Sequence, residues 1–183
     1  MIKLINTFII TGGPGVGKTT IIQELERRGY NCIDEAARQI IKEQVINNGD
    51  ALPWANQERY TYLMLERSID DFLKNKDDSS ITFFDRGIPD TIAYANLIKL
   101  EISNELAETV RKYRYNHIVF ILPPWEEIYQ TDSERKQTFT EAIEVYDILK
   151  RTYYDYGYRL IEVPKLKIRE RVDFILSTIV PNN

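Results

Sequence analysis

A lysine and two threonines end a glycine-rich stretch near the start of the chain, where residues 12–20 read GGPGVGKTT. Residues 12–19 fit the pattern G-x-x-x-x-G-K-[ST], whose glycines let the backbone turn so that successive N–H groups point at a phosphate. The lysine of such a loop reaches the β- and γ-phosphates, and the next hydroxyl ligates Mg2+. The stretch therefore predicts a Mg2+-dependent site for a nucleoside triphosphate, ATP or GTP. The residues expected to form it are Gly12, Gly13, Pro14, Gly15, Val16, Gly17, Lys18, Thr19 and Thr20.

An aspartate and an arginine follow the apolar run SITFF at residues 80–84. An acid at this place relative to a phosphate loop binds Mg2+, usually through water, so Asp85 is expected to share the metal with Thr19. Arg86 stands where motor-type ATPases carry a water-activating glutamate, and no D-x-x-G string of signalling GTPases begins at Asp85. Both of those classes are therefore disfavoured. Two interpretations of Arg86 stay open: catalytic contact with a phosphate or the acceptor, or a buried ion pair with a carboxylate.

Two more carboxylates, Asp34 and Glu35, follow a short candidate strand at residues 30–33. Open α/β sheets place ligands at the carboxyl ends of their strands, so both are candidates for a general base or for metal contacts. Of the two, Glu35 is expected to act in catalysis. The alternative is that Asp34 caps the following helix while Glu35 interacts with its dipole. A third acid, Asp90, is expected to cap a helix rather than bind a ligand.

A polar, charged segment at about residues 124–138 follows another apolar strand, and its place suits the mobile lid of a small kinase. Arg135 would then stabilise charge on the transferred phosphoryl group, and Lys136 is a second candidate. The alternative is a solvated charge cluster at the start of a helix. In P-loop kinases the loop after the last strand often lies against the adenine, so Pro164 and Lys165 are candidate base contacts.

The elements that must position these residues follow from the apolar pattern. Strands are expected at residues 4–10, 30–33, 80–84, 117–122 and 158–163. Helices are expected at about 20–29, 35–48, 53–74, 89–98, 103–114, 138–156 and 167–178. A near-continuous apolar strand such as 117–122 is typical of a parallel sheet covered on both faces. The pattern predicts one domain over residues 1–183, an α/β fold with a five-stranded doubly wound parallel sheet of the P-loop NTPase type.

The composition limits the kinds of partner and compartment expected for the protein. A formal net charge of −4 does not favour a broad nucleic-acid-binding surface. The single cysteine excludes an intramolecular disulfide and fits a reducing compartment. No apolar run approaches the roughly 20 residues that cross a bilayer, and the amino-terminal run does not have the form of a signal peptide. We expect a cytoplasmic protein that acts on a small-molecule acceptor, and the oligomeric state stays open.

One string is a false match. Residues 75–78, NKDD, fit the N-K-x-D string with which GTPases recognise guanine. Such a string should end a late strand, whereas this one follows a predicted helix and precedes a strand. We therefore interpret it as a solvated turn.

Five strings together resemble the NadR-like AAA family of P-loop ATPases and kinases, which includes the ribosylnicotinamide-kinase domain of NadR. They are TGGPGVGKTT at 11–20, DEAAR at 34–38, FFDRGIPDT at 83–91, LPPW at 122–125 and ERKQTF at 134–139. The resemblance covers nearly the whole chain. It implies ATP or GTP with Mg2+, and phosphoryl transfer to a small hydroxyl-bearing acceptor. Nothing in the sequence marks nicotinamide riboside as that acceptor, and the adenylyltransferase module of full NadR has no counterpart in these 183 residues.

Two functions from different classes fit these residues. In the first, a small-molecule kinase, Lys18 and the loop amides hold the phosphates while Glu35 accepts the proton of a nucleoside-like acceptor. Arg86 and Arg135 would stabilise the transition state. In the second, the protein is a nucleotide-gated regulatory module that hydrolyses the nucleotide slowly. The absence of an obvious acceptor-specificity motif supports this alternative.

Overall fold

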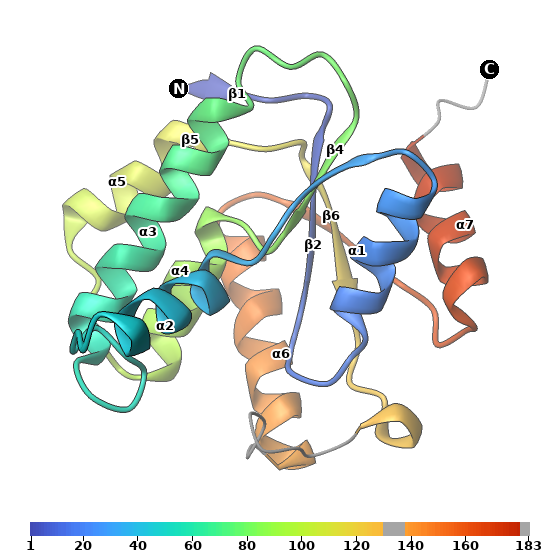
Figure 1. The fold of residues 1–183 in the computed structure, drawn as a ribbon. Helices are drawn as coiled ribbons and strands as arrows, with labels where there is room; N and C mark the ends of the chain where they lie inside the picture. The colour runs from blue at the N-terminus through green and yellow to red at the C-terminus, as the bar shows by residue number, and fades with distance from the viewer. Residues whose placement is uncertain (130–137, 180–183) are drawn as a thin grey trace.

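The computed structural model describes residues 1–129 and 138–179, in which a five-stranded sheet carries helices on both faces (Figure 1). All neighbouring strands are parallel, in the order β3-β4-β2-β6-β7. This arrangement confirms the doubly wound parallel sheet and its five predicted strands. Their bounds are β2 (Thr7–Gly12), β3 (Asn31–Ile33), β4 (Thr82–Asp85), β6 (Ile118–Leu122) and β7 (Arg159–Glu162).

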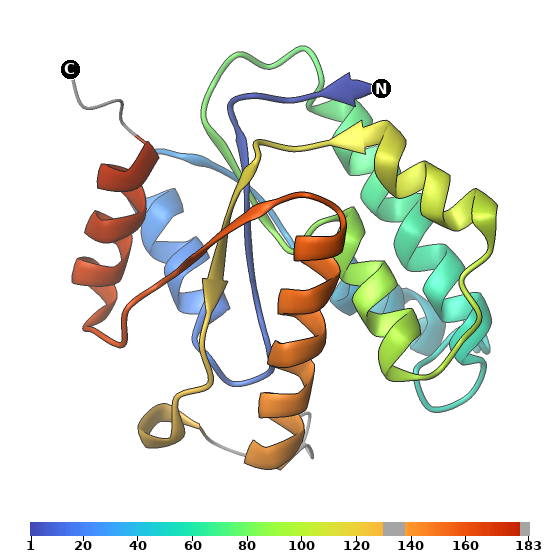
Figure 2. The ribbon, with the colours of Figure 1, turned by 180° about the vertical axis from the view of Figure 1, so that it is seen from behind.

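Helices cover the two faces of the sheet because alternate strand residues point to opposite sides. Ile9 of β2 belongs to one buried apolar cluster, whereas Phe8 and Ile10 belong to the other. Figures 1 and 2 show α1 and α7 together on one side and α3, α4 and α6 on the other. The helix bounds are α1 (Lys18–Arg27), α2 (Ala36–Ile46), α3 (Gln57–Lys74), α4 (Ile88–Leu97), α5 (Asn104–Lys112), α6 (Phe139–Asp155) and α7 (Ile168–Ile179).

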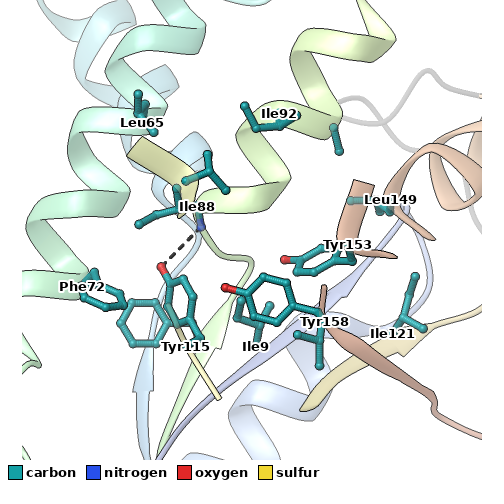
Figure 3. Packing of buried hydrophobic residues seen from close by; sticks show 14 of the residues in the cluster. Ile9, Leu65, Phe72, Ile88, Ile92, Tyr115, Ile121, Leu149, Tyr153 and Tyr158 are labelled. Carbon is teal, nitrogen blue, oxygen red and sulfur yellow. Dashed lines mark hydrogen bonds between the residues drawn. The ribbon is translucent and has the colours of Figure 1, made fainter. Parts of the chain in front are cut away.

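Aromatic side chains fix α3 and α4 against the sheet (Figure 3). The Tyr115 ring is buried, and its centroid lies 5.0 Å from that of Phe72 on α3 and 5.3 Å from that of Phe84 on β4. Both pairs meet edge to face, a geometry worth about 1 kcal/mol per pair beyond the area buried. The Ile88 backbone N–H at the start of α4 donates to the Tyr115 hydroxyl. The Tyr115 hydroxyl thereby fixes the turn between β4 and α4.

Two local predictions were wrong. Residues 113–114 do not end a helix but form β5 (Tyr113–Arg114), which pairs in parallel with β1 (Ile2–Lys3) as a separate two-stranded sheet. A helix was also expected from residue 53, yet α3 begins at Gln57. The reason is local: the Asn56 side chain accepts from the Arg59 backbone N–H and caps the helix at that point. None of the helices in the described ranges combines the length and apolarity needed to span a membrane.

Candidate active site

The glycine-rich loop joins β2, the middle strand of the sheet, to the amino end of α1. Its backbone is left-handed at Gly15 (φ 73°) and Gly17 (φ 88°), where a Cβ atom would be strained. Among the described residues no side chain caps α1, so the partial positive charge of the helix end is left for a ligand. A pocket of about 730 Å³, here called the loop pocket, is lined by every residue from 14 to 20.

Lys18 is folded back onto its own loop. Its side chain is buried, and Nζ donates to the carbonyl oxygens of Gly12 and Gly13, each at 3.0 Å. Burial lowers the Lys18 pKa to about 8, assisted by the charge of Arg86 and opposed by nearby carboxylates. The ammonium group is therefore charged at neutral pH, but the surrounding carboxylates do not fully offset the cost of burying that charge. An incoming phosphate would supply the missing negative charge.

Asp85 ends β4 beside the loop strand, in register with Ile10 of β2. Its side chain is 8% exposed, and its Oδ1 atom has no hydrogen-bond partner among the described residues. Burial raises the pKa of Asp85, against the opposing charges of Lys18 and Arg86. Thr19 is exposed and lines the loop pocket. A carboxylate oxygen without a partner and a threonine hydroxyl on the phosphate loop are groups of the kind that bind a hard cation such as Mg2+.

Protein ligands alone would not complete such a metal site. In residues 1–129 and 138–179 no three His, Cys, Asp or Glu side chains are grouped to hold a metal. Mg2+ commonly keeps several waters and takes substrate phosphates as ligands beside one or two protein groups. The site therefore fits a cation that arrives with a nucleotide.

Glu35 and Arg86 form an ion pair between the strand ends and α2. Arg86 Nε donates to Glu35 Oε1 at 2.7 Å, and Arg38 Nε donates to Glu35 Oε2 at 3.1 Å. Burial would raise the pKa of Glu35, but the charges of Arg86, Lys18 and Arg38 outweigh it and lower the pKa. Glu35 is thus ionised. It is the N-cap residue of α2 without a side-chain capping bond, and Asp34 is exposed.

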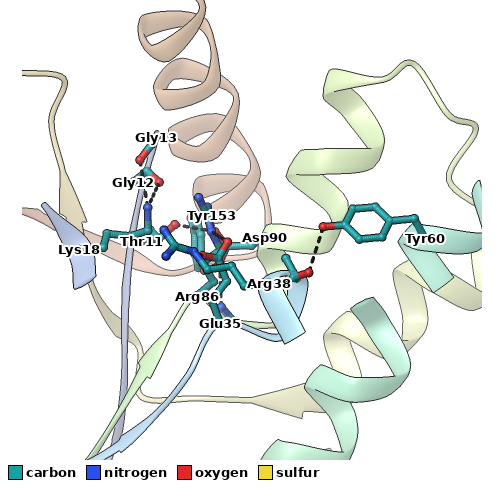
Figure 4. A network of polar contacts seen from close by, with 12 residues as sticks. Thr11, Gly12, Gly13, Lys18, Glu35, Arg38, Tyr60, Arg86, Asp90 and Tyr153 are labelled. Carbon is teal, nitrogen blue, oxygen red and sulfur yellow. Dashed lines mark hydrogen bonds and ion pairs between the residues drawn. The ribbon is translucent and has the colours of Figure 1, made fainter. Parts of the chain in front are cut away.

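Asp90 fixes the other side of Arg86 (Figure 4). Its carboxylate accepts from Arg86 Nη1 at 3.1 Å, from Thr11 Oγ1 at 2.6 Å, from the Gly87 backbone N–H at 2.9 Å, and from the Tyr153 hydroxyl. The expected capping role of Asp90 is confirmed by the Gly87 contact. Arg86 forms the ion pair with carboxylates that one of its two interpretations expected, although its side chain is only partly buried, and its catalytic contact stays a prediction. The wider role of Asp90 was missed, although its i,i+4 spacing from Arg86 could have indicated the pair.

A second pocket of about 200 Å³ adjoins the loop pocket and is lined mainly by apolar and aromatic side chains from α3, α4 and α6. The Tyr60 and Tyr94 rings meet edge to face there, with centroids 5.5 Å apart. The Tyr94 hydroxyl is buried and has no hydrogen-bond partner in the described part of the chain. The two pockets share five lining residues: Pro14, Glu35, Ala37, Tyr60 and Arg86.

The remaining predicted site residues are placed differently. Arg135 and Lys136 lie outside the described residues, as does most of the lid-like segment at 124–138. Its described part includes the 3₁₀ helix η1 (Glu126–Ile128), and Trp125 and Ile128 line the loop pocket. Pro164 and Lys165 are not among the lining residues, whereas 166–168, next in the chain, are. Arg171 of α7 also lines this pocket, and no motif in the sequence pointed to it.

Comparisons with known proteins agree with this architecture. A family model described as an AAA domain matches residues 7–171. A comparison with curated protein sequences finds no match. Among solved structures, the chain is similar to the NadR protein in complex with NR, with TM-score 0.72 and 16% identity over 96% of this chain and 50% of that chain. The chain thus spans half the length of that NadR structure.

Two kinases are similar to the chain over most of both lengths. Shikimate kinase from Acinetobacter baumannii in complex with shikimate has TM-score 0.58 and 16% identity, over 98% of this chain and 95% of that chain. Deoxyadenosine kinase from M. mycoides with products dCMP and dCDP has TM-score 0.56 and 16% identity, over 94% and 97%. At these identities the likeness concerns the fold alone, which is that of the P-loop NTPases.

Proposed function

This chain belongs to the AAA-domain family, and from that premise we propose that it is a Mg2+-dependent small-molecule kinase. The observation that carries the proposal is the meeting of two pockets. The loop pocket is formed by the phosphate loop, and the second pocket is formed mainly by side chains of α3, α4 and α6. Glu35 and Arg86 line both pockets. A kinase needs this arrangement, because the γ-phosphate of the donor must reach the acceptor hydroxyl without crossing water.

The loop pocket would hold the donor, ATP or GTP. Lys18 Nζ would exchange its two carbonyl acceptors for β- and γ-phosphate oxygens, and the amino end of α1 would bind the same charge. Thr19 and the unpartnered oxygen of Asp85 would hold Mg2+. When bound, the metal neutralises charge on the phosphate oxygens.

Glu35 and Arg86 line both pockets and are here called the junction; they would act on the acceptor hydroxyl and on the transferred group. Glu35 accepts a hydrogen bond from the acceptor hydroxyl and takes its proton as the oxygen bonds to the γ-phosphorus. The bond from the γ-phosphorus to the bridging oxygen breaks, and the nucleoside diphosphate leaves. Arg86, which lines both pockets, would stabilise the charge on the transferred phosphoryl group, and Arg135 would add a second charge from the lid.

The low pKa of Glu35 sets a condition on this step. Both carboxylate oxygens accept from an arginine, so an acceptor hydroxyl would have to share an oxygen with one of these contacts or displace it. Arg38 is the easier of the two to displace, because its side chain is 53% exposed and that of Arg86 is 22% exposed. Displacing it would also bring the Glu35 pKa back towards its ordinary value.

The second pocket favours a compact acceptor with a planar ring. Its walls carry the aromatic rings of Tyr60, Phe84, Tyr94 and Tyr115, which offer edge and face contacts to such a ring. The buried Tyr94 hydroxyl is a hydrogen-bond donor in need of an acceptor atom on the ligand. A nucleoside-like hydroxyl compound meets both requirements.

The test is transfer of the labelled γ-phosphoryl group from ATP, with Mg2+, to a panel of nucleosides and simple sugars. The proposal expects a phosphorylated nucleoside-class product, and its formation should depend on Glu35. Slow release of phosphate without transfer to any panel member would instead support the nucleotide-gated module. Absence of both activities together with absence of nucleotide binding would reject the proposal.

A further inference from the structure

Arg171 of α7 is a buried charge without a counter-ion. Its side chain is 3% exposed, and Nη2 donates to the Val16 carbonyl oxygen of the phosphate loop at 3.1 Å. A Cβ atom added at Gly17 would lie 3.0 Å from Nη1, and the guanidinium carbon is 5.6 Å from the centre of the Trp125 ring. Among the described residues no carboxylate pairs with Arg171, and its Nε atom has no hydrogen-bond partner.

This isolation contrasts with Arg86, a partly buried arginine of the site, which faces Glu35 and Asp90. Taking a guanidinium out of water without a paired anion is costly, and burial accordingly lowers the Arg171 pKa. Packing alone does not explain the residue, because an apolar side chain of similar length would fill the space without that cost. A buried charge of this kind suits a site that receives an anion.

The anion expected here is the polyphosphate of the donor nucleotide. Arg171 lines the loop pocket and donates to the backbone at the Val16–Gly17 bend, so its charge lies beside the part of the loop that would hold the phosphates. Gly17 also provides the N-cap of α1, where the helix end adds its own partial positive charge. The Arg171 charge and the amino end of α1 both favour a negative charge at this bend of the loop.

We propose that Arg171 is a positioning residue of the donor site, which holds the Val16–Gly17 bend and supplies positive charge that the nucleotide polyphosphate compensates. The inference rests on nucleotide binding by the loop pocket, as in the proposed function, but not on the identity of the acceptor. It assigns part of the ligand affinity to a residue 153 positions after Lys18 in the chain.

The test compares Arg171→Met and Arg171→Lys with the wild type, and Arg169→Met serves as control because Arg169 is an exposed arginine of the same helix. Calorimetric titration with ATP and with inorganic tripolyphosphate measures affinity, and thermal unfolding without ligand measures stability. Arg171→Met should weaken both ligands by about tenfold or more. It should unfold at no lower temperature than the wild type, because it removes an unpaired charge. Arg171→Lys should retain most of the affinity.

Wild-type affinity in Arg171→Met, or equal weakening in Arg171→Lys, would overturn the charge role. Loss of folding in Arg171→Met would show a structural role and overturn it too. In a transfer assay the nucleotide KM should rise while kcat stays within about threefold, a split that general loosening of the fold would not produce. If the wild type binds neither ligand, the proposed function fails first. If it binds both and Arg171→Met does not differ, this inference alone fails.

Discussion

The two pockets differ in what builds them. The loop pocket is centred on seven consecutive residues, 14–20, whose backbone turns and helix end provide most of the binding chemistry. The second pocket takes its walls from side chains that lie between Pro14 and Leu149 in the chain and come from several helices. Backbone groups recognise a phosphate whatever the side chains are, whereas side chains decide which molecule fits.

The difference indicates which parts of the site can change independently. Most substitutions in α3, α4 or α6 can reshape the second pocket without changing the lining of the loop pocket, because among the described residues Tyr60 is the one residue of these helices that lines both pockets. Glu35 and Arg86, like Pro14 and Ala37, also line both pockets, so changes at these positions affect both. Variants of the donor site, of the Glu35–Arg86 junction and of Asp90, which supports Arg86, should therefore have distinguishable effects.

The largest effect is expected from Lys18→Met, which removes the buried ammonium group from the loop pocket. Transfer should fall by about 10³-fold or more, because no other group on the loop supplies a full charge to the β- and γ-phosphates. Lys76→Met is the matched control, since Lys76 is exposed in the turn at 75–78. Transfer of the γ-phosphoryl group measures both. A comparable loss in Lys76→Met would show that the NKDD turn takes part after all.

Glu35→Gln should affect the junction and leave the loop pocket intact. We expect transfer to fall by about 10²-fold, because the amide cannot accept the acceptor proton. Nucleotide affinity should stay unchanged or tighten, since a negative charge near the phosphates is removed. Rapid-quench transfer and calorimetric binding separate the two effects, with the exposed Glu26→Gln as control. Full transfer by Glu35→Gln would remove Glu35 from the role of base.

Asp90→Asn tests the support beneath the junction. The change leaves the partly buried Arg86 with one fewer anionic partner and removes a buried carboxylate from its network, so the free energy of unfolding should fall by about 3 kcal/mol. Tyr153→Phe, which removes a single donor to Asp90, should cost about 1 kcal/mol. Denaturant unfolding measures both changes against Asp77→Asn, an exposed acid in a turn. Equal stability of Asp90→Asn and the wild type would mean that Arg86 is held by Glu35 alone.

How much of the site the sequence could predict follows from the same distinction. The loop, Asp85 and Glu35 were found because each belongs to a short string next to a strand. The contacts of Asp90 with Thr11 and Tyr153 join residues 79 and 63 positions away, which no local pattern encodes. Arg171 was missed for the same reason, since it reaches the loop only after α7 packs beside α1. The strand pair β1–β5 likewise depends on a distant partner rather than on local propensity.

The smallest predicted effect is a pH dependence of nucleotide binding that originates at Lys18 in the loop pocket. Lys18 has a pKa of about 8 in the free protein, and bound phosphate would raise it because the charged form gains a partner. Below pH 8 the ammonium group is already charged, so ATP affinity is complete. Above pH 8, binding must take up a proton, so affinity should fall, by about eightfold between pH 7.5 and pH 9.

Calorimetric titration with ATP across this range tests the prediction. Burial raises the pKa of Tyr60, the tyrosine shared by both pockets, so its hydroxyl does not titrate in the same range. Lys18→Met should bind ATP weakly at every pH and show no step near pH 8. A step that persists in Lys18→Met would assign the proton to another group. A flat wild-type profile would mean that Lys18 is not the cation that receives the phosphates.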